Sequence, residues 1–243
     1  MPTLVYASSL LSASTEEAVT WWPYHWHWFY QVTLLLIISD FANYWVHRCL
    51  HEWHHGWAMH KLHHSLSQLN WSASPKAHVL EQFSNLGPRM LVLIIPGVQP
   101  EVILMYMLYN TAVSYINHSN ITLNTRWFNT FLYTPDHHRF HHSQVVREAN
   151  SNYSGPTLIW DVIFGTLYLP STEGPQILGL GQGEDVTEWQ HQHSIWKAYW
   201  LQCLAPIKYW LGIAATTTET TLTKRKVARS SSSLRGSASR VHE

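Results

Sequence analysis

Clustered histidines are the feature that most constrains this sequence. Of the 18 histidines in 243 residues, seven lie between residues 47 and 64, and four more lie between residues 137 and 142. The stretches 60–64 and 138–142 both read HxxHH, and His47 and His51 are four residues apart. Residues three and four apart share one face of a helix, so each set is expected to project its imidazoles together.

Imidazole is the commonest protein ligand of Zn, Fe, Cu and Ni ions. One ion needs three or four imidazoles, so eight or nine that converge indicate two metal ions. Histidines that merely sit at an interface as half-polar residues would not repeat one helical spacing. A neutral imidazole ligand gives its second ring N–H to a partner. The acids placed to accept it are Asp40, Glu52, Glu81, Asp136 and Asp161.

A competing motif lies inside the first cluster. His51, Glu52 and His55 fit HExxH, the helix signature of zinc metalloproteases, in which the glutamate activates water. This motif is short, and it leaves the HxxHH sets unexplained.

The composition narrows the class of protein. Fifteen basic and 15 acidic side chains give no net charge, which argues against a nucleic-acid partner. Charged residues are only 12% of the chain, about half of the usual ~25%, while 14 tryptophans and 12 tyrosines are many. These values exclude disorder and favour a membrane-associated protein. Cys49 and Cys203 are expected to be free thiols.

Three apolar stretches are candidates for membrane helices. Residues 26–46 are long enough for one span, and residues 195–215 favour a tilted or interfacial helix because they contain lysines. Between them, residues 89–95 and 101–116 read as a broken hairpin, interrupted by prolines. An aromatic belt is expected before the first span, at Trp21, Trp22, Tyr24, Trp26 and Trp28.

The placement of basic residues predicts the orientation. Arginines and lysines follow residue 46, whereas the first 20 residues contain none and do not resemble a secretory signal peptide. Nearly everything after residue 46 is therefore expected on the cytoplasmic side. Residues 216–243 are basic and rich in serine and threonine, which predicts a disordered tail.

Several motifs together resemble the fatty acid hydroxylase/sterol desaturase superfamily. They lie at residues 40–51 (DxxxYWxHRxxH), 57–65 (WxxHxxHHS), 118–120 (HSN), 134–143 (TPxxHRxHHS) and 152–166, and the histidine stretches look most like the alkylglycerol monooxygenase branch. The resemblance covers roughly residues 40 to 170.

The resemblance implies a non-haem di-iron centre that uses O2 and external electrons to attack an unactivated C–H bond of a membrane lipid. The ligands carried over are His47, His51, His60, His63, His64, His118, His138, His141 and His142. Further ligands or groups that orient ligands would be His78, His137, Asp40, Glu52, Glu81 and Asp161. Trp160, Asp161, Gly165 and Thr166 are interpreted as structural. Ser114 stands where some members carry another histidine.

The sequence thus predicts an all-α integral membrane domain over residues 26–215, between an N-terminal segment (1–25) and the tail, with its di-metal site facing the cytoplasm. The expected localisation is the endoplasmic reticulum in a eukaryote or the inner membrane in a bacterium. The expected partners are a sterol, fatty acyl or alkylglycerol lipid and an electron donor of cytochrome b5/reductase, ferredoxin or pterin type.

Whether the reaction is hydroxylation or desaturation stays open. The alternatives are an intramembrane zinc protease and a non-enzymatic metal carrier. Two interpretations stay open for Tyr106, Met107, Tyr109 and Tyr115: they line a channel that opens to the bilayer, or they only face lipid.

Overall fold

The computed structural model describes residues 22–93, 97–122, 129, 132–170, 174–181 and 195–212. This part of the chain is helical and holds no strand, only an isolated bridge between Ser143 and Leu178. The predicted helical class is therefore confirmed. The helices are α2 (Trp28–Glu52), α3 (His54–His64), the 3-10 turn η1 (Trp71–Ala73), α4 (Val79–Leu93), α5 (Pro100–Asn117), α7 (Pro135–His141), α8 (Val146–Ala149), α9 (Ile159–Ile163) and α11 (Ile195–Trp210).

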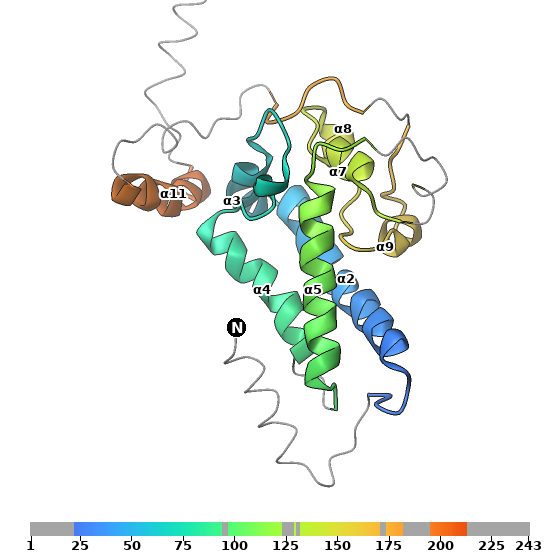
Figure 1. Ribbon diagram of the computed structural model, residues 1–243. Helices are drawn as coiled ribbons and strands as arrows, with labels where there is room; N and C mark the ends of the chain where they lie inside the picture. Colours follow the sequence, from blue (N-terminus) through green and yellow to red (C-terminus); the bar gives the residue numbers. More distant parts are fainter. Residues whose placement is uncertain are drawn as a thin grey trace, which may run out of the picture.

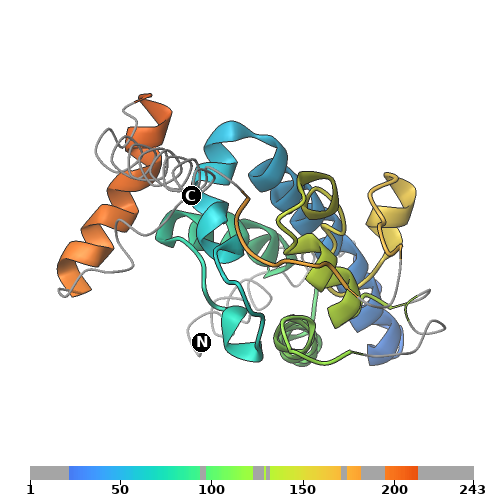
Figure 2. The same cartoon turned by 90° about the horizontal axis from the view of Figure 1, so that it is seen from above.

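Helices α2, α4 and α5 form a bundle, and the short helices α3, α7, α8 and α9 gather at one end of it (Figure 1). Helix α3 follows α2 after a sharp bend, and α7, α8 and α9 lie at the same end of the bundle. Helix α11 packs against α3 at the side, as the view from above shows (Figure 2). Every histidine motif lies in this end of the molecule.

Local sequence signals explain where the helices begin and end. Helix α2 ends because Trp53 adopts an extended conformation. Pro100 lies in the first turn of α5, where a missing N–H costs no helical hydrogen bond. Helix α7 starts in the same way at Pro135, and Thr134 and His137 form a capping box around its first turn.

An apolar core joins α2 and α5 at the end of the bundle that lies away from the histidines. Its buried members are Trp22, Val32, Leu35, Val98, Val102, Ile103 and Tyr106. The buried Gln31 ties the preceding segment to this core, since it accepts a hydrogen bond from the Trp22 indole N–H at 2.6 Å. The N-terminal halves of α2 and α5 thus hold the bundle together, and their C-terminal ends carry histidines.

One buried carboxylate fastens the segment 151–167 to the bundle, and a second one holds the segment together internally. Asp40 of α2 accepts hydrogen bonds from the Gly155 N–H at 2.9 Å and from the Thr157 hydroxyl. Asp161 accepts from the N–H groups of Tyr153 and Ser154 and from the Thr166 hydroxyl. The segment has little regular structure, so these side chains replace the backbone partners that a helix would supply.

The predicted apolar stretches coincide with helices, since residues 26–46 fall almost wholly in α2, residues 101–116 in α5, and most of residues 195–215 in α11. In the described part of the chain, no helix combines the length and the apolarity needed to cross a membrane. The predicted spans are therefore not confirmed. The predicted N-terminal segment up to residue 21 and the predicted tail lie outside the described residues.

Two helical glycines provide a matched test of this packing. A Cβ on Gly56 of α3 would lie 2.7 Å from the carbonyl oxygen of Cys49 and 2.8 Å from the Cα of Leu50, whereas a Cβ on Gly87 of α4 would meet nothing within 4 Å. We expect Gly56→Ala to lower the free energy of unfolding by about 3 kcal/mol, because helix backbone must move. Gly87→Ala should change it by less than about 1 kcal/mol, because the gain in helix propensity is offset by the contact of the new Cβ with the ring of Pro88. Denaturant unfolding of both variants measures this, and equal effects would contradict the close approach of α2 and α3.

Candidate metal centre

The structure brings the nine histidines carried over from the sequence into two adjoining groups, in each of which the possible ligand nitrogens lie within 4.8 Å of one another. The first group contains His47, His51, His60, His64 and His141. The second group contains His63, His118, His138 and His142. All are buried except His47, which is half-buried. The rings of His64 and His142 stack at 4.3 Å between centroids where the groups meet.

Each group draws on several elements. Helix α2 supplies His47 and His51, and the C-terminal end of α5 supplies His118. Helix α3 and the segment of α7 supply histidines to both groups, because neighbouring residues on a helix point about 100° apart. His63 and His64 therefore enter different groups, as do His141 and His142.

Backbone carbonyls fix the tautomers of four rings. The Nδ1 atoms lie 2.7–2.8 Å from carbonyl oxygens: His47 from Tyr153, His63 from Lys76, His118 from Ser114 and His141 from Ser151. A carbonyl can only accept a hydrogen bond, so Nδ1 carries the proton in each ring. In the neutral ring, Nε2 then presents a lone pair.

The lone pairs of the second group point at one another. The Nε2 atom of His118 lies 3.1 Å from Nε2 of His63 and 2.9 Å from Nε2 of His138. The Tyr133 hydroxyl donates to the Asn152 carbonyl, so its oxygen accepts from Nδ1–H of His138, which leaves Nε2 of His138 unprotonated as well. Three lone pairs this close repel each other unless a cation lies among them. Nitrogen ligands at right angles around an ion, with bonds of about 2.1 Å, are also about 3 Å apart.

The first group contains ring nitrogens that lack a partner. Nε2 of His51 and Nε2 of His141 are buried and have no hydrogen-bond partner among the described residues. His51 directs its other nitrogen at the Asn150 side-chain oxygen, at 3.3 Å. Buried polar atoms without partners are rare in folded proteins, and a bound metal ion would satisfy both.

Burial keeps these imidazoles neutral, which is the form that binds metal. It lowers the pKa of His63 and of His118 from 6.5 to about 4. Burial also holds the pKa values of His51, His60, His64, His138, His141 and His142 well below 6.5, and neighbouring imidazoles lower them further. A proton is therefore a poor substitute for a metal cation among the facing lone pairs. The two nitrogen donor sets fit the metal centre that the resemblance implies, and imidazole suits Fe, Zn, Cu and Ni alike.

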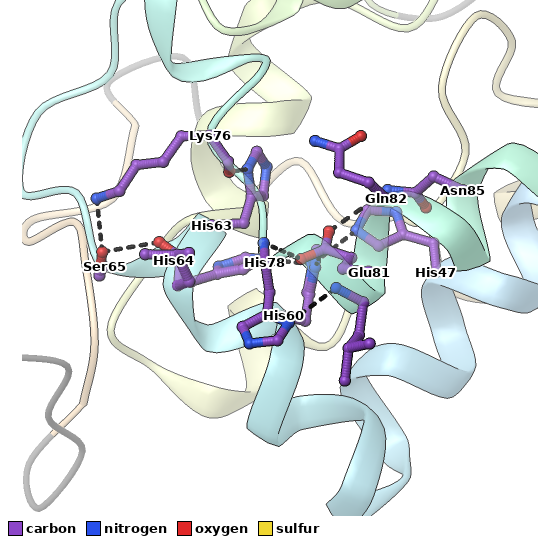
Figure 3. Close-up of polar contacts among 12 residues, drawn as sticks. His47, His60, His63, His64, Ser65, Lys76, His78, Glu81, Gln82 and Asn85 are labelled. Atoms are coloured by element: carbon purple, nitrogen blue, oxygen red, sulfur yellow. Dashed lines mark hydrogen bonds and ion pairs between the residues drawn. The ribbon is translucent and has the colours of Figure 1, made fainter. Parts of the chain in front are cut away.

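Five acids were candidates for holding a histidine ring. Within the described residues, Glu81 is the one whose carboxylate contacts such a ring. Its Oε1 lies 2.9 Å from Nδ1 of His60, and both side chains are buried. Figure 3 shows Glu81 of α4 between His60 and His47. Burial raises the pKa of Glu81. This contact is the arrangement that orients a metal-binding imidazole.

The other acids contact other groups. Asp40 and Asp161 hold the segment 151–167, although Asp161 thereby also positions the Tyr153 carbonyl that His47 uses. Glu52 pairs with Arg48 at 2.9 Å and is partly exposed. Asp136 binds Asn129 and Arg139.

Two further histidines from the sequence prediction lie outside both groups. His78 is buried, and its Nδ1 accepts the N–H of Leu80. His137 caps α7, since its Nδ1 accepts the N–H of Thr134. Both use ring nitrogens for local structure.

The residues of the HExxH motif do not lie on one face of a continuous helix. Helix α2 ends at Glu52, and α3 begins at His54, so a helix break separates His51 from His55. The His55 ring packs against Trp210 of α11, with 5.6 Å between centroids. The motif therefore lacks the geometry of a metalloprotease site.

A cavity of about 280 Å³ opens onto both groups and is lined in part by His47, His60, His63, His118 and His138. Of the four residues that could line a lipid channel, Tyr115 lines this cavity. Tyr106 belongs to the apolar core with Met107 packed against it, and Tyr109 is 43% exposed. Tyr106 therefore neither lines a channel nor faces lipid, because this side of α5 faces α2.

The helical fold and the paired histidine groups define a helical protein with two candidate metal sites, and comparison identifies the family. The chain belongs to the fatty acid hydroxylase family, whose model matches residues 32–166. It is 30% identical over 159 residues to the ornithine lipid hydroxylase OlsE of Rhizobium tropici, covering 65% of this chain and 48% of that protein. It is 30% identical over 185 residues to the alkylglycerol monooxygenase of Homo sapiens, covering 74% and 40% respectively.

Methylsterol monooxygenase 1-3 of Arabidopsis thaliana is 27% identical over 142 residues, covering 56% of this chain and 47% of that protein. The chain thus spans less than half the length of these relatives. No solved structure matches it. The resemblance to the superfamily, and to the alkylglycerol monooxygenase branch in particular, is confirmed.

The contact between Glu81 and His60 leads to a test on metal affinity. We expect Glu81→Ala to weaken Zn²⁺ binding about 10- to 100-fold, because the buried Nδ1–H of His60 loses its acceptor. Glu81→Gln keeps an acceptor oxygen and should fall between this variant and wild type. Competition with a chelator measures the affinity, and circular dichroism checks the fold. The exposed Glu101 provides the control Glu101→Ala. Equal affinities in all four proteins would refute the role of Glu81.

Proposed function

We propose that this chain is the catalytic part of a lipid monooxygenase. Each histidine group would hold one metal ion, and the chemistry that the bound ions would supply is the activation of O2, so that one oxygen atom enters an unactivated C–H bond of a lipid. The other oxygen atom leaves as water, with two electrons and two protons supplied from outside. The observation that carries the proposal is the convergence of unprotonated ring nitrogens in two buried groups, in a family whose named relatives hydroxylate lipids. Iron is the metal that suits this reaction.

The protein residues would do three things in this reaction. The nine histidines hold the ions, and the carbonyls of Tyr153, Lys76, Ser114 and Ser151 keep the rings in the ligating tautomer. Burial keeps the rings neutral and limits access of water. The cavity beside both groups receives the part of the lipid that reacts. Residues 26–215 form the catalytic domain in this proposal, and residues 1–25 and 216–243 flank it.

The same proposal covers the electron donor, the substrate, the location of the enzyme and the type of reaction. The electrons come from a separate donor of cytochrome b5/reductase, ferredoxin or pterin type. The substrate is a membrane lipid of sterol, fatty acyl or alkylglycerol type, so the enzyme works at the endoplasmic reticulum or the bacterial inner membrane, with its site facing the cytoplasm. Hydroxylation is favoured over desaturation because the ornithine lipid and alkylglycerol relatives are named for oxygen insertion.

Two alternatives fit less well. A zinc protease needs Glu52 free to activate water, but Glu52 pairs with Arg48, and the helix breaks before His55. A metal carrier needs ligands spread along a path, whereas these nine histidines are gathered at one end of the bundle.

Metal content tests whether the two groups act separately. We expect about two ions per chain in wild type, and about one in His141→Ala and in His142→Ala. Paired substitutions give the sharper result. His51→Ala with His141→Ala removes two ligands of one group and should leave one ion. His141→Ala with His142→Ala damages both groups and should leave almost none. Elemental analysis with protein quantitation measures this. A single ion in wild type, or equal loss in both double variants, would rule out two separate metal sites.

Activity separates the oxygenase from the protease alternative. We expect His51→Ala to abolish O2-dependent lipid oxidation and His55→Ala to leave it within about twofold, because His55 contacts α11 and not the metal groups. Mass spectrometry of lipids gaining one oxygen atom provides the measurement, with iron-loaded full-length protein. The protease alternative requires both histidines and Glu52 equally. Peptide cleavage that Glu52→Gln eliminates, without lipid oxidation by wild type, would replace the proposed function.

A further inference from the structure

Trp57 of α3 packs against three imidazoles of the first histidine group. Its ring centroid lies 5.4 Å from that of His51, 5.5 Å from that of His64 and 6.4 Å from that of His60. Aromatic rings at such distances are in contact. Trp57 lies outside the apolar core that joins α2 and α5, so its packing concerns the histidine end of the molecule.

Trp57 also connects these imidazoles with the surface. The three rings that it contacts are buried, whereas Trp57 is half-buried. Trp53, whose carbonyl accepts the backbone N–H of Trp57 at 2.9 Å, is 58% exposed. His51 lies close to the surface on the same side, since its ring contacts the exposed Asn150 and the next residue, Glu52, is exposed. The first group therefore approaches solvent beside Trp57.

This side of the first group differs from the side that the cavity reaches. Within the described residues, the cavity lining includes His47 and His60 of this group, but neither His51 nor His64. Trp57 does not belong to the lining either. A lipid in the cavity would therefore leave the Trp57 side of the group accessible from the surface.

Tyr153 is another aromatic side chain on the first group, but it is placed differently. Its ring contacts those of His47, His51 and His141. Tyr153 is fully buried, and its hydroxyl donates to the exposed Glu52 at 3.3 Å. A donor at the surface would meet the carboxylate there and not a conjugated ring. Trp57 itself is partly exposed, so its indole spans the distance from the surface to the imidazoles.

The contacts of Trp57 continue to the second group. The His64 ring, which Trp57 contacts, stacks on His142 with 4.3 Å between centroids. His142 is a member of the second group. Three rings in contact, those of Trp57, His64 and His142, thus run from the surface to both groups.

We propose that Trp57 is the residue through which electrons enter the metal centre. This inference rests on the proposed function, which needs two external electrons for each O2. The donor is a one-electron carrier that contacts the surface at Trp57. In each transfer the donor loses one electron, and iron held by the histidines is reduced from Fe(III) to Fe(II). No bond of Trp57 forms or breaks. Its indole shortens the gap between donor and ion, and electron transfer slows steeply as that gap widens.

Anaerobic stopped-flow reduction of the iron-loaded full chain tests this role. The probe is the methyl viologen radical cation, a one-electron donor that loses its colour on transfer. We expect Trp57→Leu to slow reduction of Fe(III) about tenfold, or about 1.4 kcal/mol in the activation barrier, and Trp57→Phe, which keeps a smaller ring, to slow it about threefold. The matched control is Trp53→Leu, because the exposed Trp53 contacts His55 and not the metal groups. Its rate should match that of wild type.

Two further measurements distinguish electron transfer from a structural role. Iron content and Zn²⁺ affinity should be unchanged in Trp57→Leu, because Trp57 supplies no ligand. Lipid oxidation driven by hydrogen peroxide needs no external electrons, since the peroxide supplies the oxygen atom and leaves as water. Trp57→Leu should therefore retain the peroxide-driven reaction and lose the reaction driven by donor and O2 by the same factor as reduction.

Unchanged reduction in Trp57→Leu would overturn the inference. So would a loss of peroxide-driven oxidation as large as the loss of donor-driven oxidation. If the leucine variant does not retain iron, Trp57→Phe decides in its place, and reduction as fast as in wild type overturns the inference. The proposed function fails separately, when reduction depends on Trp57 but neither O2 nor peroxide yields an oxidised lipid.

Discussion

The structure depends on backbone carbonyls that hold protons on the outer nitrogens of the histidine rings. Such a carbonyl needs a lone pair to spare, and carbonyls inside a helix already accept a backbone hydrogen bond. Three of the four carbonyls come from irregular segments: Lys76 lies between η1 and α4, and Ser151 and Tyr153 lie after α8. The fourth, from Ser114 in the last turn of α5, accepts from the backbone N–H of His118 as well as from its ring. Irregular segments and a helix end therefore face the histidines, since these leave acceptors available.

The same constraint explains the buried carboxylates away from the metal groups. The segment 151–157 can direct two carbonyls at His141 and His47 only if its own N–H groups have partners. Asp161 and Asp40 supply these partners from α9 and α2. Ser154 and Gly155 are held by the same two side chains. One short segment thus orients rings with its carbonyls and forms a wall of the cavity.

Helical spacing predicted which histidines gather, but not how they divide. HxxHH indicates that the three residues lie near one face, and all nine expected histidines do lie together. Whether His63 or His64 joins a given group depends on which other helices stand opposite, and spacing contains no such information. Asp40 illustrates the same limit. It lies two turns before His47, yet its partners are 115 and 117 residues away in the sequence. The carbonyl partners left no signal at all, because every residue has a carbonyl.

The apolar core and the histidine groups occupy opposite ends of the same helices, and this separation has a physical consequence. The facing lone pairs make the histidine end unfavourable without a cation, since desolvation also opposes protonation. Within the described residues, the core around Leu35 and Ile103 is built from apolar side chains with Tyr106 among them, so its packing does not depend on that end. The bundle can therefore form first and present a site that metal binding completes. Metal binding in such an arrangement stabilises the histidine end of the bundle and not the whole fold.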